Sequence, residues 1–172
     1  MEYRKLGGSK LTVSIISYGA WAIGGPPFWK SKDKNVSINA IKKAFDSGIN
    51  LFDTAPVYGL GYSEELIGKV LKDYRKDIFI ATKCGLRWDS NNKIYHNLKR
   101  KSILEEIELS LKRLQTDYID LYQVHWPDPD TPIEETMVTL KEIQDAGKIN
   151  YIGVSNFSVE QIKESLNYAS IV

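Results

Sequence analysis

The sequence predicts an α/β fold made of repeated βα units around a parallel sheet. One observation is a pattern that recurs five times, in which a short apolar strand leads through a loop into an amphipathic helix. A second is the spacing of the strands, about 28 to 40 residues, which suits βα units. The strands are expected to begin near Ile15, Asn50, Ile78, Tyr118 and Ile149. A third is that no linker or low-complexity tract interrupts residues 1–172, so we expect a single domain.

The first element is expected to be an N-terminal hairpin over residues 1–14. Its two strands span residues 2–6 and 11–13, and the pair Gly7-Gly8 forms the turn between them. The first helix should follow the first strand of the sheet and run over residues 36–47. It should stop at Gly48, because glycine readily adopts the left-handed conformation of a helix end.

Capping residues mark the start of the later helices. Ser63 is expected to cap the second helix, whose first turn carries Glu64 and Glu65. The third helix is expected over residues 99–114, where apolar side chains recur at helical spacing.

The last two helices begin with a sequence typical of a capping box. Residues 131–134 read Thr-Pro-Ile-Glu, with proline at the first helical position, and this fourth helix should end at Gly147. Ser158 and Gln161 form the corresponding pair for the fifth helix.

Composition excludes several classes of function. The 172 residues are 42% hydrophobic, enough for a core, and 23 basic residues nearly balance 22 acidic ones. This balance favours neither nucleic acid nor an anionic membrane as a partner, and we interpret the lysines at positions 30, 32 and 34 as a solvated loop. No signal peptide opens the chain, and no apolar run approaches the ~20 residues of a membrane span. The single cysteine, Cys84, excludes an internal disulfide, so we expect a cytoplasmic protein.

Ionisable side chains stand at the ends of three successive strands. Asp53, Lys83 and His125 each follow or end an apolar strand, and Tyr58 lies in the loop after the first of these strands. Side-chain alternation places the three strand-end residues on one face, together with inward residues such as Leu51, Phe79, Ala81, Ile119 and Leu121. If the strands curl into a barrel, the ionisable three point inward at the carboxyl-terminal rim, where such barrels keep their active sites.

These four residue types suit proton transfer to a carbonyl group. A tyrosine is a reluctant acid at pH 7, and a nearby lysine ammonium is expected to lower the pKa of the Tyr58 phenol. Asp53 would keep Lys83 charged, and a neutral imidazole at His125 could hydrogen-bond the carbonyl oxygen. None of the four can donate a hydride, so a cofactor must supply it.

Other interpretations remain for each residue taken singly. An aspartate or a lysine at a strand end, such as Asp53 or Lys83, is more often part of a structural ion pair. A lone histidine such as His125 is more often buried with its hydrogen bonds satisfied, and a lone tyrosine such as Tyr58 more often serves packing. The joint occurrence of the four residues favours a functional site. A metal site would need more ligands than two histidines offer. A catalytic thiol at Cys84 is disfavoured because no histidine base stands beside it, and we assign His96 no role.

Several long motifs in the right order resemble the aldo-keto reductase superfamily, in particular its bacterial NADPH-dependent branch. They read LFDTAPVYG at 51–59, SEELIG at 63–68, ATK at 81–83, DYIDLYQVHW at 117–126 and GKINYIGVSNF at 147–157. The resemblance implies a (β/α)8 TIM barrel and NADPH-dependent reduction of aldehydes or ketones to alcohols. It also implies a catalytic tetrad, with Tyr58 as the acid, and a nicotinamide carboxamide site. The tetrad is Asp53, Tyr58, Lys83 and His125, and the carboxamide site is Ser155 and Asn156. Without the resemblance, Ser155-Asn156 would be interpreted as an ordinary polar turn.

Four tryptophans are expected around the mouth of the barrel. Trp21, Trp29, Trp88 and Trp126 lie after strands or in βα loops, and large amphipathic rings there suit a mostly apolar substrate pocket. Residues 24–27 would carry Phe28 and Trp29 over the mouth, and Trp126 could instead simply fill the rim.

The chain supplies an incomplete barrel, namely the hairpin and about five βα units. A complete barrel needs eight units and about 250 residues, with phosphate-binding elements after the last strands. Two hypotheses follow: the chain is part of a longer NADPH-dependent carbonyl reductase, or it is a half-barrel that is inactive and self-associates into a homo-oligomer through open sheet edges. In the second case, the inward side chains of the five strands are expected to face water.

Overall fold

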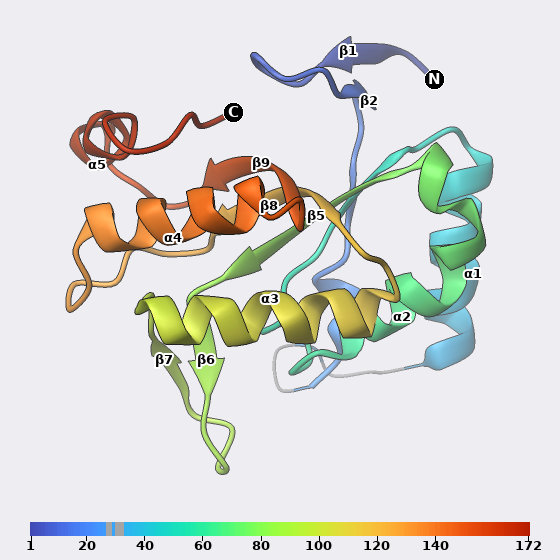
Figure 1. The fold of residues 1–172 in the computed structure, drawn as a ribbon. Coiled ribbons are helices and arrows are strands. Elements are labelled where there is room, and N and C mark those ends of the chain that lie inside the picture. The colour runs from blue at the N-terminus through green and yellow to red at the C-terminus, as the bar shows by residue number, and fades with distance from the viewer. Residues whose placement is uncertain (27–28, 30–32) are drawn as a thin grey trace.

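The structure is a computed structural model that describes residues 1–26, 29 and 33–172 (Figure 1). The expected positions of Phe28 over the barrel mouth and of Lys30 and Lys32 in a solvated loop lie outside these residues.

Five parallel strands form the central sheet, in the order β3-β4-β5-β8-β9. They are β3 (Tyr18–Gly19), β4 (Leu51–Asp53), β5 (Phe79–Cys84), β8 (Ile119–Val124) and β9 (Ile149–Val154). Two antiparallel pairs lie outside the sheet: β1 (Tyr3–Lys5) with β2 (Thr12–Ser14), and β6 (Leu86–Trp88) with β7 (Ile94–His96). The strand order follows the chain order, as expected for consecutive βα units.

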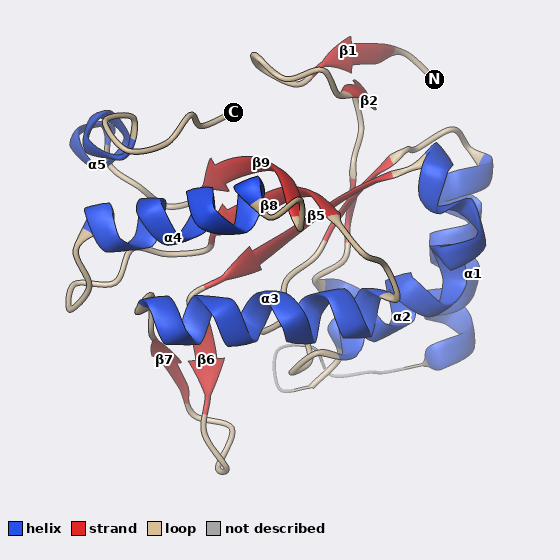
Figure 2. Cartoon of the chain, in the orientation of Figure 1, coloured by secondary structure: helices blue, strands red, loops and turns tan. Residues whose placement is uncertain are grey.

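Helices connect the strands and cover one face of the sheet (Figure 2). They are α1 (Lys34–Asp46), α2 (Tyr62–Leu71), α3 (Arg100–Leu114), α4 (Ile133–Asp145) and α5 (Val159–Ser165), with short 3-10 helices η1 (Ala22–Gly24) and η2 (Lys72–Asp77). Each α-helix packs against the next one along the chain. The parallel sheet with helices is therefore the expected partial TIM barrel, and no helix within the described residues is long and apolar enough to span a membrane.

The main core lies between the sheet and the helices. Phe52, Ile80, Tyr122 and Ile152 are buried there at 0 to 2% exposure, one from each of the four strands that follow β3. Their neighbours along each strand point to the opposite face, because strand side chains alternate. This alternation directs Asp53, Lys83 and Gln123 away from the helices.

The N-terminal hairpin caps the amino end of the opposite, inner face. Its Lys10 N–H donates to the Tyr151 hydroxyl of β9 at 2.9 Å, and the Asn50 side chain hydrogen-bonds both to Ser14 N and to Thr12 O. Leu51 lines a groove together with hairpin residues such as Val13. The hairpin therefore occupies the position expected for the bottom of a barrel.

The expectation that the inward side chains face water is wrong for three of the five. Ala81, Ile119 and Leu121 are only 2%, 0% and 8% exposed, while Leu51 and Phe79 are half-buried. Ile119 belongs to the buried apolar cluster, Ala81 is short, and Leu121 packs beside β9. Neighbouring strands and the hairpin thus cover much of the inner face.

Two of the expected helix caps are wrong. Gly61, in the left-handed conformation, precedes α2, and Ser63 lies inside the helix, where its hydroxyl donates to the Ala20 carbonyl at 2.9 Å. Thr131 does not cap α4, because its hydroxyl donates to Asp128 at 2.7 Å and Pro132 holds the N-cap position. In both cases a tertiary partner competes successfully for the hydroxyl.

Other expected boundaries are confirmed to within a few residues. The Ser158–Gln161 capping box is present, and Gly48 has the left-handed φ of +86°. The first strand begins at Tyr18 rather than Ile15, and Ile15 and Ile16 are 50% and 58% exposed. The β6–β7 hairpin was not expected, although its turn, Asp-Ser-Asn-Asn at 89–92, is rich in turn-forming residues.

Candidate active site

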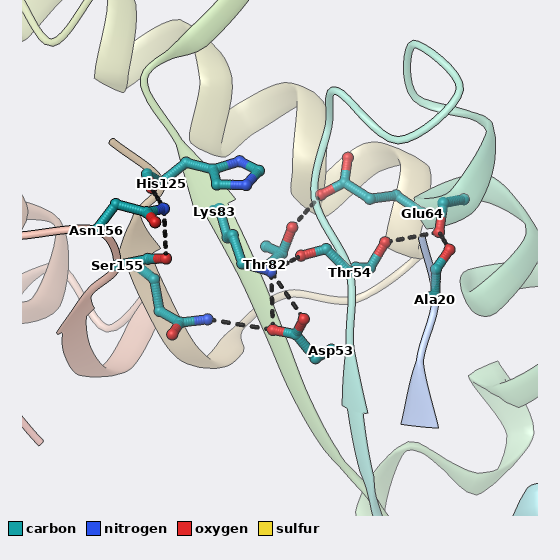
Figure 3. A network of polar contacts seen from close by, with 11 residues as sticks. Ala20, Asp53, Thr54, Glu64, Thr82, Lys83, His125, Ser155 and Asn156 are labelled. Atoms are coloured by element: carbon teal, nitrogen blue, oxygen red, sulfur yellow. Dashed lines mark hydrogen bonds and ion pairs between the residues drawn. The ribbon is translucent and has the colours of Figure 1, made fainter. Parts of the chain in front are cut away.

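Four polar side chains converge where the central strands end. Asp53 is the last residue of β4, Lys83 lies near the end of β5, and His125 directly follows β8. Tyr58 comes from the loop between β4 and α2. Figure 3 shows Lys83 reaching across from its strand toward Asp53, with His125 nearby.

Lys83 and Asp53 form an ion pair on the inner face of the sheet. Lys83 Nζ donates to Asp53 Oδ1 at 2.9 Å, to Asp53 Oδ2 at 2.8 Å and to the Thr54 carbonyl at 2.8 Å. The three donors of the ammonium are therefore all engaged. Burial lowers the pKa of Lys83, and the charge of Asp53 opposes this effect.

The Tyr58 phenol is held in its protonated form. Burial, and secondly the charge of Asp53, raise the pKa of Tyr58 to about 12. The expectation that Lys83 lowers this pKa is therefore wrong for this structure. Lys83 Nζ lies 5.1 Å from the Tyr58 ring centroid, but its charge is paired with that of Asp53, and burial and the Asp53 charge decide the direction of the shift.

The His125 imidazole is neutral at physiological pH. Burial lowers the pKa of His125 to about 4, with further lowering by the charges of Lys83 and His96. The His125 ring meets the Tyr58 ring edge-on, with 5.7 Å between centroids. His96, to which the sequence assigned no role, contacts the Pro127 carbonyl through Nδ1 at 3.0 Å.

The backbone around Tyr58 is fixed by a contact between two glycines. Gly59 has a φ of +64°, and a Cβ placed on it would lie 2.0 Å from the Gly24 carbonyl oxygen. A Cβ on Gly24 would lie 2.7 Å from the Tyr58 carbonyl carbon. The 3-10 helix η1 therefore packs directly onto the backbone of Tyr58 and Gly59, as only residues without a side chain allow.

A network on the helix side of the sheet supports the strand ends (Figure 3). The Thr54 hydroxyl lies 2.8 Å from the Ser63 hydroxyl, which in turn donates to Ala20 O. The fully buried Glu64 accepts from the Thr82 hydroxyl and from Arg113 Nε, each at 2.6 Å. The sequence interpretation assigned Ser63 and Glu64 only to the start of a helix and missed this role.

A further residue missed from the sequence is Gln123. Its Nε2 donates to Asp53 Oδ1 at 3.3 Å, and its position is the register partner of Lys83. The side-chain alternation that located His125 also placed Gln123 on the inner face, so a signal for it was present.

Ser155 and Asn156 follow β9 on the same side as His125. Asn156 has a φ of +60°, and its Nδ2 donates to the His125 carbonyl at 2.9 Å and to Ser155 Oγ at 3.0 Å. This arrangement leaves the Asn156 Oδ1 as an acceptor and the Ser155 hydroxyl proton as a donor. A primary carboxamide presents the complementary donor and acceptor, so these residues fit the nicotinamide group.

One of the four tryptophans, Trp21, adjoins Tyr58, and Trp29 packs against Trp21. The rings of Trp21 and Trp29 meet edge-on at 5.5 Å, and Trp21 lies 6.3 Å from the Tyr58 ring. Trp126 follows His125 and is 45% exposed. Trp88 instead lines a cavity of about 220 Å³ beside α3, together with residues that include Glu106 and Arg113.

Metal and thiol chemistry find little support in the geometry. Within the described part of the chain, no three His, Cys, Asp or Glu side chains are grouped so that they could hold a metal ion. Cys84 faces the helix-side core, where burial raises the pKa of its thiol well above the ordinary value.

Comparison with known proteins shows which family the chain resembles. The family model "Aldo/keto reductase family" matches residues 15–172. A relative 54% identical over 164 residues, covering 94% of this chain and 49% of that protein, is the aldo-keto reductase YhdN of Bacillus subtilis (strain 168). Another, 41% identical over 185 residues and covering 99% of this chain and 57% of that protein, is the NADH-specific methylglyoxal reductase of Escherichia coli (strain K12).

A solved structure with the same fold is the glycerol dehydrogenase AKR11B4 from Gluconobacter oxydans. Its TM-score is 0.89 at 40% identity, over 98% of this chain and 53% of that one. The chain thus spans about half the length of the relatives it matches.

Gly59→Ala should displace Tyr58 and destabilise the protein. The new methyl group would collide with the Gly24 carbonyl as well as strain a positive φ. We expect a loss of at least about 2 kcal/mol more than for Gly147→Ala, measured by urea denaturation. Gly147 is a matched control because its φ is +76° but nothing lies within 4 Å of its Cβ position. Equal losses for the two variants would contradict the close packing of η1 on Tyr58.

The neutral state of His125 should make the protein less stable as the pH falls. Its native pKa of about 4 lies below the ordinary 6.5, so the unfolded chain binds a proton first. The contribution of His125 to the free energy of unfolding is therefore full above about pH 6.5. It decreases by about 2–3 kcal/mol as the pH falls toward 4.

The measurement compares urea denaturation of the protein and of His125→Asn between pH 7 and 4. The comparison is needed because Glu106 also titrates in this range, with a pKa raised from 4.5 to about 7 by burial. Its contribution to the free energy of unfolding is lost as the pH rises from 4.5 to about 7, which is opposite to the effect of His125. In His125→Asn, the free energy of unfolding should no longer show the increase with pH that His125 contributes. Parallel curves for the two proteins would show that His125 titrates normally.

Proposed function

The chain belongs to the aldo/keto reductase family, and on that premise we propose that its protein reduces aldehydes or ketones to alcohols with NADPH. The observation that carries the proposal is the Lys83–Asp53 ion pair beside the protonated Tyr58 and the neutral His125. Because the chain spans about half the length of its relatives, the activity is proposed for the protein with a complete barrel.

Tyr58 is the proposed general acid. A phenol with a pKa of about 12 keeps its proton at neutral pH. An alkoxide formed from a carbonyl is a far stronger base, with a conjugate-acid pKa of roughly 16, as for water. Proton transfer from the Tyr58 hydroxyl to that oxygen is therefore downhill, without any prior lowering of the phenol pKa. The nearby Lys83 ammonium would favour the phenolate that results.

His125 is proposed to orient the carbonyl group. A neutral imidazole can donate one ring N–H to the carbonyl oxygen while adding no charge that would compete with Lys83. The edge-on contact of the His125 and Tyr58 rings lets both groups approach one oxygen atom. The two donors would then fix which lone pair of the oxygen receives the proton.

Ser155 and Asn156 are proposed to hold the nicotinamide carboxamide of the cofactor. Bound there, the reduced nicotinamide supplies the hydride that no side chain of this chain can provide. We propose NADPH as the cofactor, while one relative is named as NADH-specific. The Asn156 bond to the His125 carbonyl supports this proposal, because it joins Asn156 to one of the four proposed catalytic residues.

The substrate is proposed to be a small molecule with an apolar or aromatic body. Trp21 and Trp29 form an edge-on pair beside Tyr58 and would serve as one wall of its pocket. Trp126, exposed next to His125, is proposed as a second wall, and Trp88 as a more distant contact. We also propose a cytoplasmic location and no nucleic-acid or membrane partner, from the balanced charge and the single cysteine.

Tyr58→Phe should abolish carbonyl reduction in the complete enzyme. Loss of the proton donor typically costs about 10²–10⁴-fold in rate, while NADPH binding, measured by fluorescence titration, should change little. Tyr95→Phe is the matched control, because Tyr95 is 42% exposed on β7. If Tyr58→Phe kept more than about a tenth of the parent turnover, another group would have to be the acid.

The alternative proposal concerns the 172 residues by themselves. Strand β3 is one end of the sheet, and Ile15 and Ile16 are exposed beside it. At the other end, β9 is covered in part by Ile171, which forms a parallel bridge with Ile152. Val159 on α5 and Leu166 just after that helix are 60% and 54% exposed. Free edges and apolar patches of this kind favour association between chains. We therefore expect the isolated chain to form homo-oligomers and to have no reductase activity.

Sedimentation velocity of the isolated chain measures this association. Ile16→Lys should shift the distribution toward monomer, because a charge would be placed beside the free edge of β3. A monomeric isolated chain that reduced an aldehyde with NADPH would contradict both parts of the alternative.

A further inference from the structure

We propose that Gln123 is a positioning residue of the active site, which holds the Asp53 carboxylate in the orientation that keeps Lys83 beside Tyr58. The inference rests on the proposed carbonyl reduction and adds a fifth residue to the four whose chemistry was described above. Gln123 acts through Asp53 and is not itself assigned a contact with substrate or cofactor.

The sheet brings Gln123 to this position. Gln123 on β8 is the register partner of Lys83 on β5 and of Gly153 on β9. Partners in neighbouring parallel strands share a face, so the Gln123 and Lys83 side chains lie side by side on the inner face. From there the Gln123 Nε2 reaches Asp53 Oδ1 at 3.3 Å, across β5.

Asp53 needs a second donor because Lys83 alone does not enclose it. The Asp53 side chain is 34% exposed, whereas that of Lys83 is only 7% exposed. Lys83 Nζ binds both carboxylate oxygens, so the carboxylate could still tilt about this single point of attachment. The Gln123 amide attaches Oδ1 from a second direction.

An uncharged donor is the suitable type for this place. A second cation beside Asp53 would compete with Lys83 for the carboxylate. It would thereby weaken the attraction between Asp53 and the Lys83 ammonium. A second carboxylate would repel Asp53. A carboxamide donates a hydrogen bond without changing the charge balance of the pair.

Gly153 leaves the room that Gln123 occupies. A Cβ on Gly153 would lie 3.0 Å from Gln123 Cγ and 3.1 Å from Leu121 Cδ1. The space left by the missing side chain of Gly153 on β9 is therefore filled by the long side chain of Gln123 on β8. This fit is a second observation, independent of the hydrogen bond, that the Gln123 side chain has a defined place.

The first test is Gln123→Leu in the complete enzyme. Leucine is one atom shorter and cannot donate a hydrogen bond, so kcat should fall about tenfold. The KM values for the carbonyl substrate and for NADPH should stay within about twofold, because Gln123 holds neither. Gln144→Leu is the matched control, since the Gln144 amide also donates one hydrogen bond, to the Asn150 carbonyl at 2.8 Å.

The second test is the pH dependence of Gln123→Glu. At pH 8 the introduced carboxylate repels Asp53, so kcat should be lower than in Gln123→Leu. As the pH falls toward about 5.5, the introduced group takes up a proton and can donate O–H to Asp53, so kcat should recover about tenfold relative to Gln123→Leu. A purely structural role for Gln123 would not produce this recovery.

The third test asks whether Gln123 acts through Asp53. In an Asp53→Asn background, adding Gln123→Leu should lower kcat by less than about twofold, because the pair being positioned no longer exists. Full additivity of the two changes would overturn the proposal. Unchanged kcat in Gln123→Leu, or no recovery of Gln123→Glu at low pH, would overturn it too.

A measurement without turnover separates this inference from the proposed function. In proton–nitrogen NMR spectra, Asp53→Ala should shift the side-chain amide signals of Gln123, whereas Asp145→Ala on the exposed end of α4 should not. If the enzyme reduces no carbonyl compound but this shift is observed, the proposed function fails and the positioning contact stands. If carbonyl reduction is observed without the shift, the positioning contact fails and the proposed function stands.

Discussion

The buried ion pair between Lys83 and Asp53 is the interaction on which the whole site depends. Removing an ammonium from water costs several kcal/mol unless a carboxylate compensates it, and Lys83 is only 6% exposed. The compensation is possible because β4 and β5 are neighbours and Asp53 is in register with Ala81, two residues before Lys83. The same pair sets the state of the other two groups. The Asp53 charge helps to keep Tyr58 protonated, and the Lys83 charge helps to keep His125 neutral.

Carboxylates on both faces of the sheet hold the end of β5. On the inner face, Asp53 binds Lys83. On the helix side, Glu64 accepts the Thr82 hydroxyl, and Glu106 accepts the Gly85 N–H through both oxygens at 3.2 Å. Thr82 and Lys83, which follow one another in β5, thus bind carboxylates on opposite faces of the sheet. Such attachment suits catalysis, because a catalytic group displaced by a fraction of an ångström loses much of its effect.

Tyr58 is the one member of the four that lies neither in a strand nor directly after one, and its support is correspondingly different. The contact of Gly24 with Gly59 joins two loops at backbone distance, and the Thr54–Ser63 bond ties the same loop to α2. A loop supported in this way can present a side chain as reliably as a strand does. The absence of a side chain at Gly24 and Gly59 therefore helps to fix the position of Tyr58.

The sequence alone determined the order of the strands, the partial barrel and the convergence of Asp53, Lys83 and His125. Those features follow from local patterns: apolar strands at regular intervals, the alternation of side chains, and polar residues where strands end. Helix ends were predictable where the capping partner is local, as for Ser158 and Gln161. They were not predictable where the partner is distant, as for Ser63 with Ala20, because a hydroxyl can serve either a helix end or a tertiary acceptor.

Only the tertiary structure decided the electrostatic state of the site and its second layer of support. The pKa of Tyr58 depends on how deeply the ring is buried and on how close the Asp53 charge lies, and neither quantity is written in local sequence. The contact of Gln123 with Asp53, 70 residues apart in the chain, exists because β5 and β8 pair in one register. Sequence patterns identify which residues face the site, whereas distances across the sheet decide which of them bind one another, because register and burial are properties of the packed chain.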